Sequence, residues 1–144
     1  MLAIRPLSIV TAVSIYILIY IGGLVTRSGL GLSAGTDWPF PADGLLPTSE
    51  NFLEYVHRAW SGVVGLLILA TAVIAYRGRN NITRTAVISS VITLFLVGLQ
   101  IILGMLVLRS FLDPFVVATH NNLASLIFAT SLVTVILVNI PLRK

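Results

Sequence analysis

The 144-residue sequence contains no cysteine and little charge. Without cysteine, disulfides, thiolate metal sites and cysteine nucleophiles are excluded. Only 10% of the residues are charged, whereas soluble domains have about 25%. In contrast, 57% are apolar and the mean hydropathy is +1.02. The basic residues give a net charge of +4 but do not cluster with aromatics, so we expect no nucleic-acid binding. This composition predicts a multi-pass protein of the cell membrane, solvated by lipid.

Four apolar segments are each long enough to cross a hydrocarbon core of about 30 Å. We therefore predict an all-α integral membrane four-helix bundle, up-down-up-down, with 1–144 as a single domain. The predicted helices span about 7–25, 50–76, 86–108 and 114–140, and a long outer loop spans 26–49. The first segment is predicted to be a retained helix, because its apolar run exceeds the roughly 7–15 residues of a signal-peptide core.

The basic residues predict the orientation of this bundle. Six of them would lie at one end: Arg5, Arg77, Arg79, Arg84, Arg143 and Lys144. Three would lie at the other end: Arg27, Arg58 and Arg109. By the positive-inside rule, both termini are then cytoplasmic. All five acidic residues fall on the outer side: Asp37, Asp43, Glu50, Glu54 and Asp113.

The sequence has only two histidines, His57 and His120, near the outer ends of the second and fourth segments. Thr48 or Ser49 is predicted to cap the second helix. The Asp113–Pro114 pair is predicted to start the fourth helix, with proline at the first helical position. Both imidazoles would then lie about two turns into parallel helices, at nearly the same depth.

In such a bundle the second and fourth helices lie diagonally across the core. His57 and His120 can therefore face each other across a central cavity, which suits axial ligation of one haem iron. The alternative is two separate polar side chains, each hydrogen-bonded within the bundle. Because ionisable residues inside membranes are usually functional, we interpret the pair as haem ligands.

Charged residues surround the predicted ligands. Glu54 is three residues before His57 and shares its helix face, and Arg58 follows Glu54 by four. The two charges either form a simple ion pair at the interface, or place a carboxylate beside a ligand held by His57. Arg27, Arg58 and Arg109 all lie at the outer face. They either anchor the helices there or bind the haem propionates.

Small residues lie near the same region: Gly22-Gly23, Ser61, Gly65 and Gly104. They would either allow close helix packing or make room for a porphyrin plane. Gln100, well inside the third helix, would either bond across helices or contact a ligand.

Several pieces of the sequence, in order, resemble the haem A synthase family. The pieces are Gly22–Arg27, Ser28–Ser33, Asp37–Pro39, Glu54–Arg58, Gln100–Gly104 and His120. The first three are similar to the exit of the family's first helix and its outer loop. Glu54–Arg58 is similar to its Glu-x-x-His-Arg motif, and the last two resemble its third helix and second histidine.

The resemblance implies oxidation of a porphyrin methyl group of haem O to the formyl group of haem A, in support of cytochrome oxidase assembly. It implies a bis-histidine haem site at His57 and His120, holding haem b or the substrate haem O, and a catalytic role for Glu54. The implied partners are haem O, further copies of the chain, membrane lipid, and haem O synthase or a quinone. The alternatives are a bis-histidine haem b electron-transfer protein and a scaffold without cofactor.

The sequence departs from the family in two ways. Familiar members have eight helices in two four-helix halves, and this sequence supplies one half, so we expect a homo-oligomer or a partner. Many relatives also have a cysteine pair in the first outer loop, where this chain reads Ala34–Phe40 without cysteine.

Overall fold

The computed structural model describes residues 3–39 and 46–140, which form four helices. These are α1 (Ile4–Ser28), α2 (Phe52–Arg77), α3 (Arg84–Arg109) and α4 (Pro114–Asn139). Each is long and apolar enough to cross a membrane, and the described residues contain no strand. The predicted all-helical, four-span membrane fold is therefore confirmed.

Side chains cap the starts of α3 and α4, whereas the cap position of α2 differs from the predicted one. It is Asn51, not Thr48 or Ser49, and the Asn51 side chain makes no capping hydrogen bond. Thr48 still orders the turn, because its N–H donates to Asn51 Oδ1 over 2.8 Å and its hydroxyl accepts from Asn51 N–H over 3.3 Å. Asp113 caps α4 as predicted, accepting from two backbone N–H groups, with Pro114 first in the helix.

The other bounds also shift from the predicted ones. Helix α1 exceeds the predicted 7–25 at both ends, and it stops where Gly29 takes a left-handed conformation with φ of 72°. Helix α3 starts two residues early, because the Thr83 hydroxyl caps it by accepting from Ala86 N–H.

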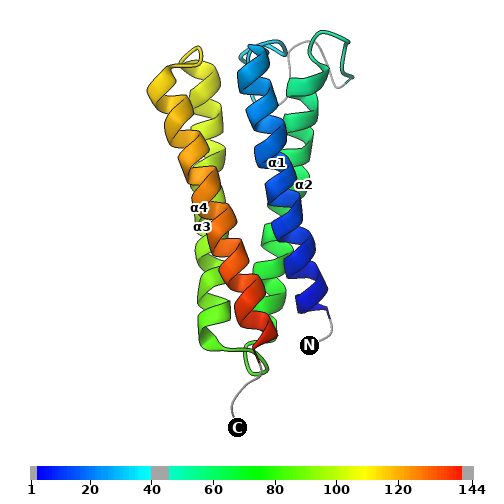
Figure 1. Ribbon diagram of the computed structural model, residues 1–144, viewed down its shortest axis with the longest axis vertical. Coiled ribbons are helices and arrows are strands. Elements are labelled where there is room, and N and C mark those ends of the chain that lie inside the picture. Colours follow the sequence, from blue (N-terminus) through cyan, green and yellow to red (C-terminus); the bar gives the residue numbers. More distant parts are fainter. Residues whose placement is uncertain (1–2, 40–45, 141–144) are drawn as a thin grey trace.

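The helices form a ring in which each contacts two neighbours (Figure 1). Helix α1 contacts α2 and α4, and α3 contacts the same two helices, whereas the described parts of α2 and α4 do not contact each other. Helices α2 and α4 are therefore diagonal, as predicted. The hairpins α1–α2 and α3–α4 separate toward one end of the bundle (Figure 1).

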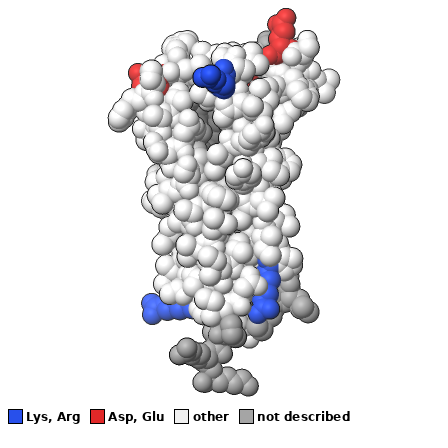
Figure 2. Space-filling view, in the orientation of Figure 1, with Lys and Arg blue, Asp and Glu red and all other residues white. Residues whose placement is uncertain are grey.

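Charge divides between the two ends and leaves an uncharged belt between them (Figure 2). Arg5, Arg77, Arg79 and Arg84 lie at the end where α1 begins and α4 finishes. The described acidic residues all belong to the opposite end: Asp37, Glu50, Glu54 and Asp113. Asp43, Arg143 and Lys144 lie outside the described residues. Which end faces the cytoplasm stays a prediction.

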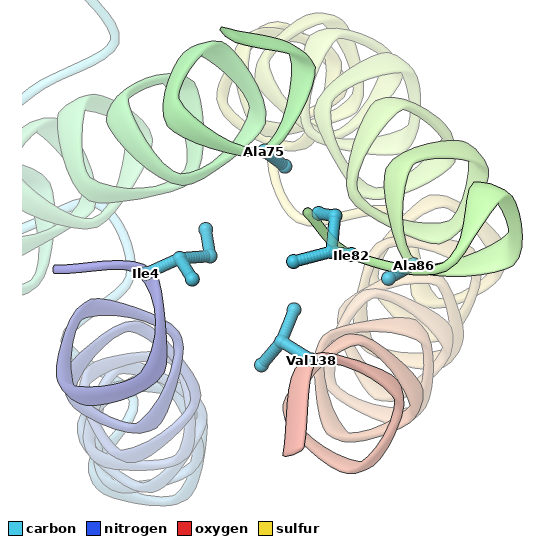
Figure 3. Packing of buried hydrophobic residues seen from close by; sticks show 5 residues of the cluster. All are labelled: Ile4, Ala75, Ile82, Ala86 and Val138. Carbon is cyan, nitrogen blue, oxygen red and sulfur yellow. The ribbon is translucent and has the colours of Figure 1, made fainter. Parts of the chain in front are cut away.

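Two apolar clusters divide the interior. The first joins Ile4, Ala75, Ile82, Ala86 and Val138 at the end where α1 begins (Figure 3). The second, called here the middle cluster, joins Ile15, Val64, Ile68 and Ile127. The interior between the two clusters is called here the hydroxyl half.

The histidine half extends from the middle cluster to the α1–α2 loop. There the four helices bury only Val25, Glu54 and Leu108. The hairpins separate toward this end (Figure 1), and few of its side chains are fully buried.

Candidate functional site

The two histidines enter the histidine half from diagonal helices at matched depth. His57 is six residues past its cap (57 − 51) and His120 is seven past its cap (120 − 113). Both side chains are half-buried. The two predicted ligands thus lie at the same level on diagonal helices, and that they face each other stays a prediction.

The His57 ring packs directly against Gly22 of α1. A Cβ atom on Gly22 would lie 2.9 Å from His57 Cε1 and 3.4 Å from Nδ1. The first distance is shorter than any ordinary carbon contact, so only glycine lets the ring take this position. A Cβ atom on the adjacent Gly23 would have nothing within 4 Å. Gly22 therefore leaves the space against which the His57 ring packs, whereas Gly23 does not.

The His120 ring packs in a similar way against a glycine of α3. A Cβ atom on Gly104 would lie 3.4 Å from His120 Cε1. The Gln100 side-chain Nε2 lies 3.1 Å from His120 Nε2 and donates to the His120 carbonyl, also over 3.1 Å. Of the two roles considered for Gln100, the bond across helices is the one present.

Both rings keep a buried polar atom without a partner. His57 Nδ1 and His120 Nδ1 make no hydrogen bond with the described residues and are closed off from solvent. Buried polar groups are nearly always satisfied, so two unpaired nitrogen atoms at the same level of the bundle indicate a missing partner. The described residues form no cluster of three or more His, Cys, Asp or Glu. A two-histidine set fits haem, whose porphyrin supplies the remaining nitrogen ligands of the iron.

Glu54 is almost fully buried, with 2% of its surface exposed. Its Oε2 accepts from the Ala34 N–H over 2.7 Å and from the Ser33 hydroxyl over 3.1 Å. Its Oε1 accepts from Arg58 Nε over 3.0 Å and forms an ion pair with Arg58 Nη2. The carboxylate therefore ties the α1–α2 loop to α2, one helical turn before His57.

Arg58 completes this attachment from the other side. Its Nη1 donates to the Asp37 carbonyl over 2.8 Å, and its Nη2 donates to the Gly35 carbonyl over 2.7 Å. The Glu54–Arg58 pair anticipated from the sequence thus exists, but it is largely buried. Its loop partners are backbone groups, which leave no residue-specific signal in the sequence.

A contact that sequence reasoning missed closes the loop end of the bundle. Phe111 and Leu112, in the α3–α4 turn, have positive φ angles of 52° and 65°, an uncommon conformation for residues other than glycine. A Cβ atom on Gly31 would lie 3.0 Å from Leu112 Cδ2. The turn therefore packs tightly against the α1–α2 loop, so the two hairpins meet at this point.

The remaining predicted residues lie at the same end but make fewer contacts. Arg27 and Arg109 are exposed in the last turns of α1 and α3, and neither has a hydrogen-bond or ion-pair partner among the described residues. Ser61 is exposed and donates to the carbonyl of Arg58. A Cβ atom on Gly65 would have nothing within 4 Å. Neither histidine ring thus packs against Ser61 or Gly65 as His57 packs against Gly22.

Comparison with known proteins gives one family match and several close relatives. The profile of COX15-CtaA, described as cytochrome oxidase assembly protein, matches residues 47–142. Heme A synthase of Bacillus licheniformis is 30% identical over 138 residues, which cover 94% of this chain and 45% of that protein. Heme A synthase of Exiguobacterium sibiricum is 34% identical over 143 residues, covering 93% and 47%. The chain spans slightly less than half the length of these curated relatives. No solved structure matches it.

Proposed function

This chain belongs to the COX15-CtaA family of cytochrome oxidase assembly proteins, and from that premise we propose that it acts as a haem A synthase. The reaction oxidises a methyl group of haem O to the formyl group of haem A within the membrane. The observation that carries this proposal is the pair His57 and His120 at matched depth on diagonal helices, each with a buried Nδ1 that has no hydrogen-bond partner among the described residues. A haem bound there supplies the porphyrin and a redox-active iron.

In this proposal the two histidines would ligate the haem iron. Gly22 supports it, because a Cβ atom there would take space that the His57 ring occupies, and Gly104 brings α3 into ordinary contact with the His120 ring. Gln100 would fix the orientation of the His120 ring. Its amide would have to turn so that the oxygen accepts from His120 Nε2–H, which leaves Nδ1 without a proton and free to bind iron. Since the ligands come from different hairpins, ligand binding would also hold the histidine half together. Haem b and haem O fit this donor set equally, because both present the same iron to the imidazoles.

Glu54 is our candidate for the catalytic carboxylate. It lies one turn from His57 on the same helix, and a buried negative charge there would favour the positive charge that develops as electrons leave the substrate. Its oxygens are held by Ser33, Ala34 and Arg58. Those bonds fix its position before substrate arrives. To orient a water molecule directly, Glu54 would have to release one of them.

The arginines would bind the propionates. Arg27 and Arg109 support this role best, because both are at the histidine end and have no partner. Arg58 would bind a propionate only by giving up its bonds to the loop carbonyls. Arginine forks match carboxylates in a bidentate geometry, so one arginine suffices for each propionate.

We further propose that the four-helix unit associates with a second copy. The exposed surface of α4 carries Asn121, Asn122 and Ser125 in the membrane-spanning part. Polar side chains facing lipid favour association with another helix. Haem O synthase and a quinone would supply the substrate and remove its electrons. Chemical crosslinking in native membranes, with Asn121→Leu and Asn122→Leu as variants, tests the association. A monomer in both the parent and the variants would contradict it.

Haem content tests the main proposal. The protein would be purified from cells that make haem O, and its optical spectrum recorded beside that of His57→Ala, His120→Ala and the control Ser125→Ala. We expect a low-spin haem spectrum that only the two histidine variants lose. Chromatography of the extracted pigment should identify haem O or haem A. Haem b alone would instead favour the electron-transfer alternative, and absence of haem after reconstitution would overturn the site.

A further inference from the structure

A small polar chamber lies in the hydroxyl half, in the centre of the bundle. Each helix contributes two residues to its lining, and all of them except Ile68 carry a hydroxyl group. The lining hydroxyl residues are 2% to 5% exposed. The first apolar cluster lies on one side of the chamber along the bundle axis and the middle cluster on the other. The chamber is thus a polar layer between two apolar ones.

Three serines in this lining have unused acceptor capacity. The Ser8 hydroxyl donates to the Arg5 carbonyl over 2.9 Å. The Ser90 and Ser131 hydroxyls likewise donate to carbonyls of their own helices, over 2.8 Å and 2.7 Å. These are their only hydrogen bonds among the described residues. A hydroxyl oxygen can accept as well as donate, so all three present unpaired lone pairs to a buried space.

The hydrogen bonds of the hydroxyl half join helices only within a hairpin. Thr11 and Thr71 share a bond of 2.8 Å between α1 and α2. Thr134 donates to Ser89 over 3.0 Å between α4 and α3, and further bonds join the same two helices. In this half, no hydrogen bond between described residues joins hairpin α1–α2 to hairpin α3–α4. The chamber lies where such a bond is missing.

We propose that the chamber binds one water molecule, which donates to Ser8 of one hairpin and to Ser90 or Ser131 of the other. The chamber volume is about 10 Å³, and one water needs roughly 10–15 Å³ together with two to four polar partners. Cavities that stay empty are lined by apolar residues, whereas each helix contributes at least one hydroxyl residue to this one. A sodium ion would be an unneutralised buried charge, because the lining contains no carboxylate.

This water bridges the two hairpins within the bundle interior. Lipid gives helices no hydrophobic reason to associate, so packing and hydrogen bonds must hold them together. A bridge in the hydroxyl half links the hairpins where they are close, while the other half stays open. The water is therefore a structural ligand of the fold, independent of whether haem binds.

A double-mutant cycle tests the bridge. The variants Ser8→Ala, Ser131→Ala and their double mutant would be melted in lipid nanodiscs. Each single variant should lower the melting temperature by a few degrees, and the double variant by no more than the larger single effect, because either change removes the same bridge. Ser28→Ala is the matched control: Ser28 is exposed on α1 and donates to a carbonyl of its own helix. Fully additive losses, or none, would overturn the bridge.

A direct observation complements the cycle and does not depend on the variants folding. A high-resolution structure of the unchanged protein should show one density peak within hydrogen-bonding distance of Ser8 Oγ and of Ser90 or Ser131 Oγ. An empty chamber would overturn the proposal. Melting in sodium chloride and in choline chloride should give the same temperature. Stabilisation specific to sodium would identify a cation in place of the water and would also overturn it.

Discussion

The hydroxyl half and the histidine half of this bundle use the same four helices in opposite ways. In the hydroxyl half, small side chains such as Ala12 and Ala72 are almost fully buried, and threonine and serine hydroxyls hold the helices of each hairpin together. In the histidine half, the side chains that face inward carry unpaired nitrogen atoms. The hydroxyl half supplies contacts between helices, and the histidine half is where we propose that a ligand binds.

The comparison shows how a membrane bundle can keep an open site. Helices in lipid associate through close packing and hydrogen bonds rather than through apolar burial. A bundle that makes those contacts along its whole length has no room for a large cofactor. Concentrating them at one end allows the other end to hold orphaned imidazoles, whose desolvation is tolerated because the hairpins are already joined elsewhere.

The largest effect should come from removing the one buried ion pair of the histidine half. Glu54→Ala leaves Arg58 largely buried without its carboxylate and frees the loop from two further bonds. Breaking a buried pair costs about 3–5 kcal/mol, and partial exposure of Arg58 favours the lower figure. We expect a clear loss in melting temperature and rapid proteolysis of the loop.

The matched control for this prediction is Glu50→Ala, because Glu50 is an exposed acid in the same region. It should melt like the parent protein. If Glu54→Ala also melted normally with an intact loop, the carboxylate would not be the attachment point of the loop. The histidine half would then be ordered by other contacts.

The next largest effect is expected at Gly22, against which the His57 ring packs. In Gly22→Ala the new methyl group would lie 2.9 Å from the ring, so the ring must move. We expect haem affinity to fall by about tenfold or more, which corresponds to roughly 1.4 kcal/mol. Gly23→Ala should bind haem normally, because nothing lies within 4 Å of that position. Haem titration followed by absorbance measures both. Equal haem affinities of the Gly22→Ala and Gly23→Ala variants would mean that the position of the His57 ring does not determine haem affinity.

A smaller loss of haem affinity is expected from substitution of Gly104, against which the His120 ring packs. In Gly104→Ala the methyl group would approach His120 Cε1 only to 3.4 Å, an ordinary contact. We expect a loss of affinity of less than tenfold, together with a shift of the haem absorption bands as the ring tilts. Gly98→Ala, on the same helix and with open space around it, is the control. A larger loss of haem affinity at Gly104 than at Gly22 would contradict the expected order of the two effects.

Much of this architecture could be predicted because the bilayer itself imposes it. Span length and apolar composition sufficed for four helices, and the up-down-up-down order sufficed for the diagonal placement of α2 and α4. The Asp113–Pro114 start was also predictable, because a cap depends only on adjacent residues. The cap of α2 was misplaced, since Thr48, Ser49 and Asn51 are all good capping residues. Their ranking depends on the mutual hydrogen bonds of Thr48 and Asn51.

The distinction between Gly22 and Gly23 could not be predicted, although both were noted. Successive residues of a helix point about 100° apart, so one of two adjacent glycines faces α2 and the other does not. Which one depends on the rotation of α1 within the bundle, a tertiary property. The partners of Glu54 were hidden for another reason. They are a backbone N–H and a serine far away in the sequence, which no local pattern connects to a carboxylate.

The smallest predicted effect belongs to the hydroxyl half and sharpens the contrast between the halves. Thr134→Val keeps the shape of the side chain but removes its bonds to Ser89 and to the Thr130 carbonyl. Such hydrogen bonds between membrane helices average about 0.6 kcal/mol, so we expect a slight loss in melting temperature. The haem spectrum should not change, since the middle cluster separates this bond from both histidines. Thr119→Val, an exposed position on the same helix, should change neither property. If Thr134→Val altered the haem spectrum, the two halves would be mechanically coupled through α4, and the division between a cohesive half and a binding half would fail.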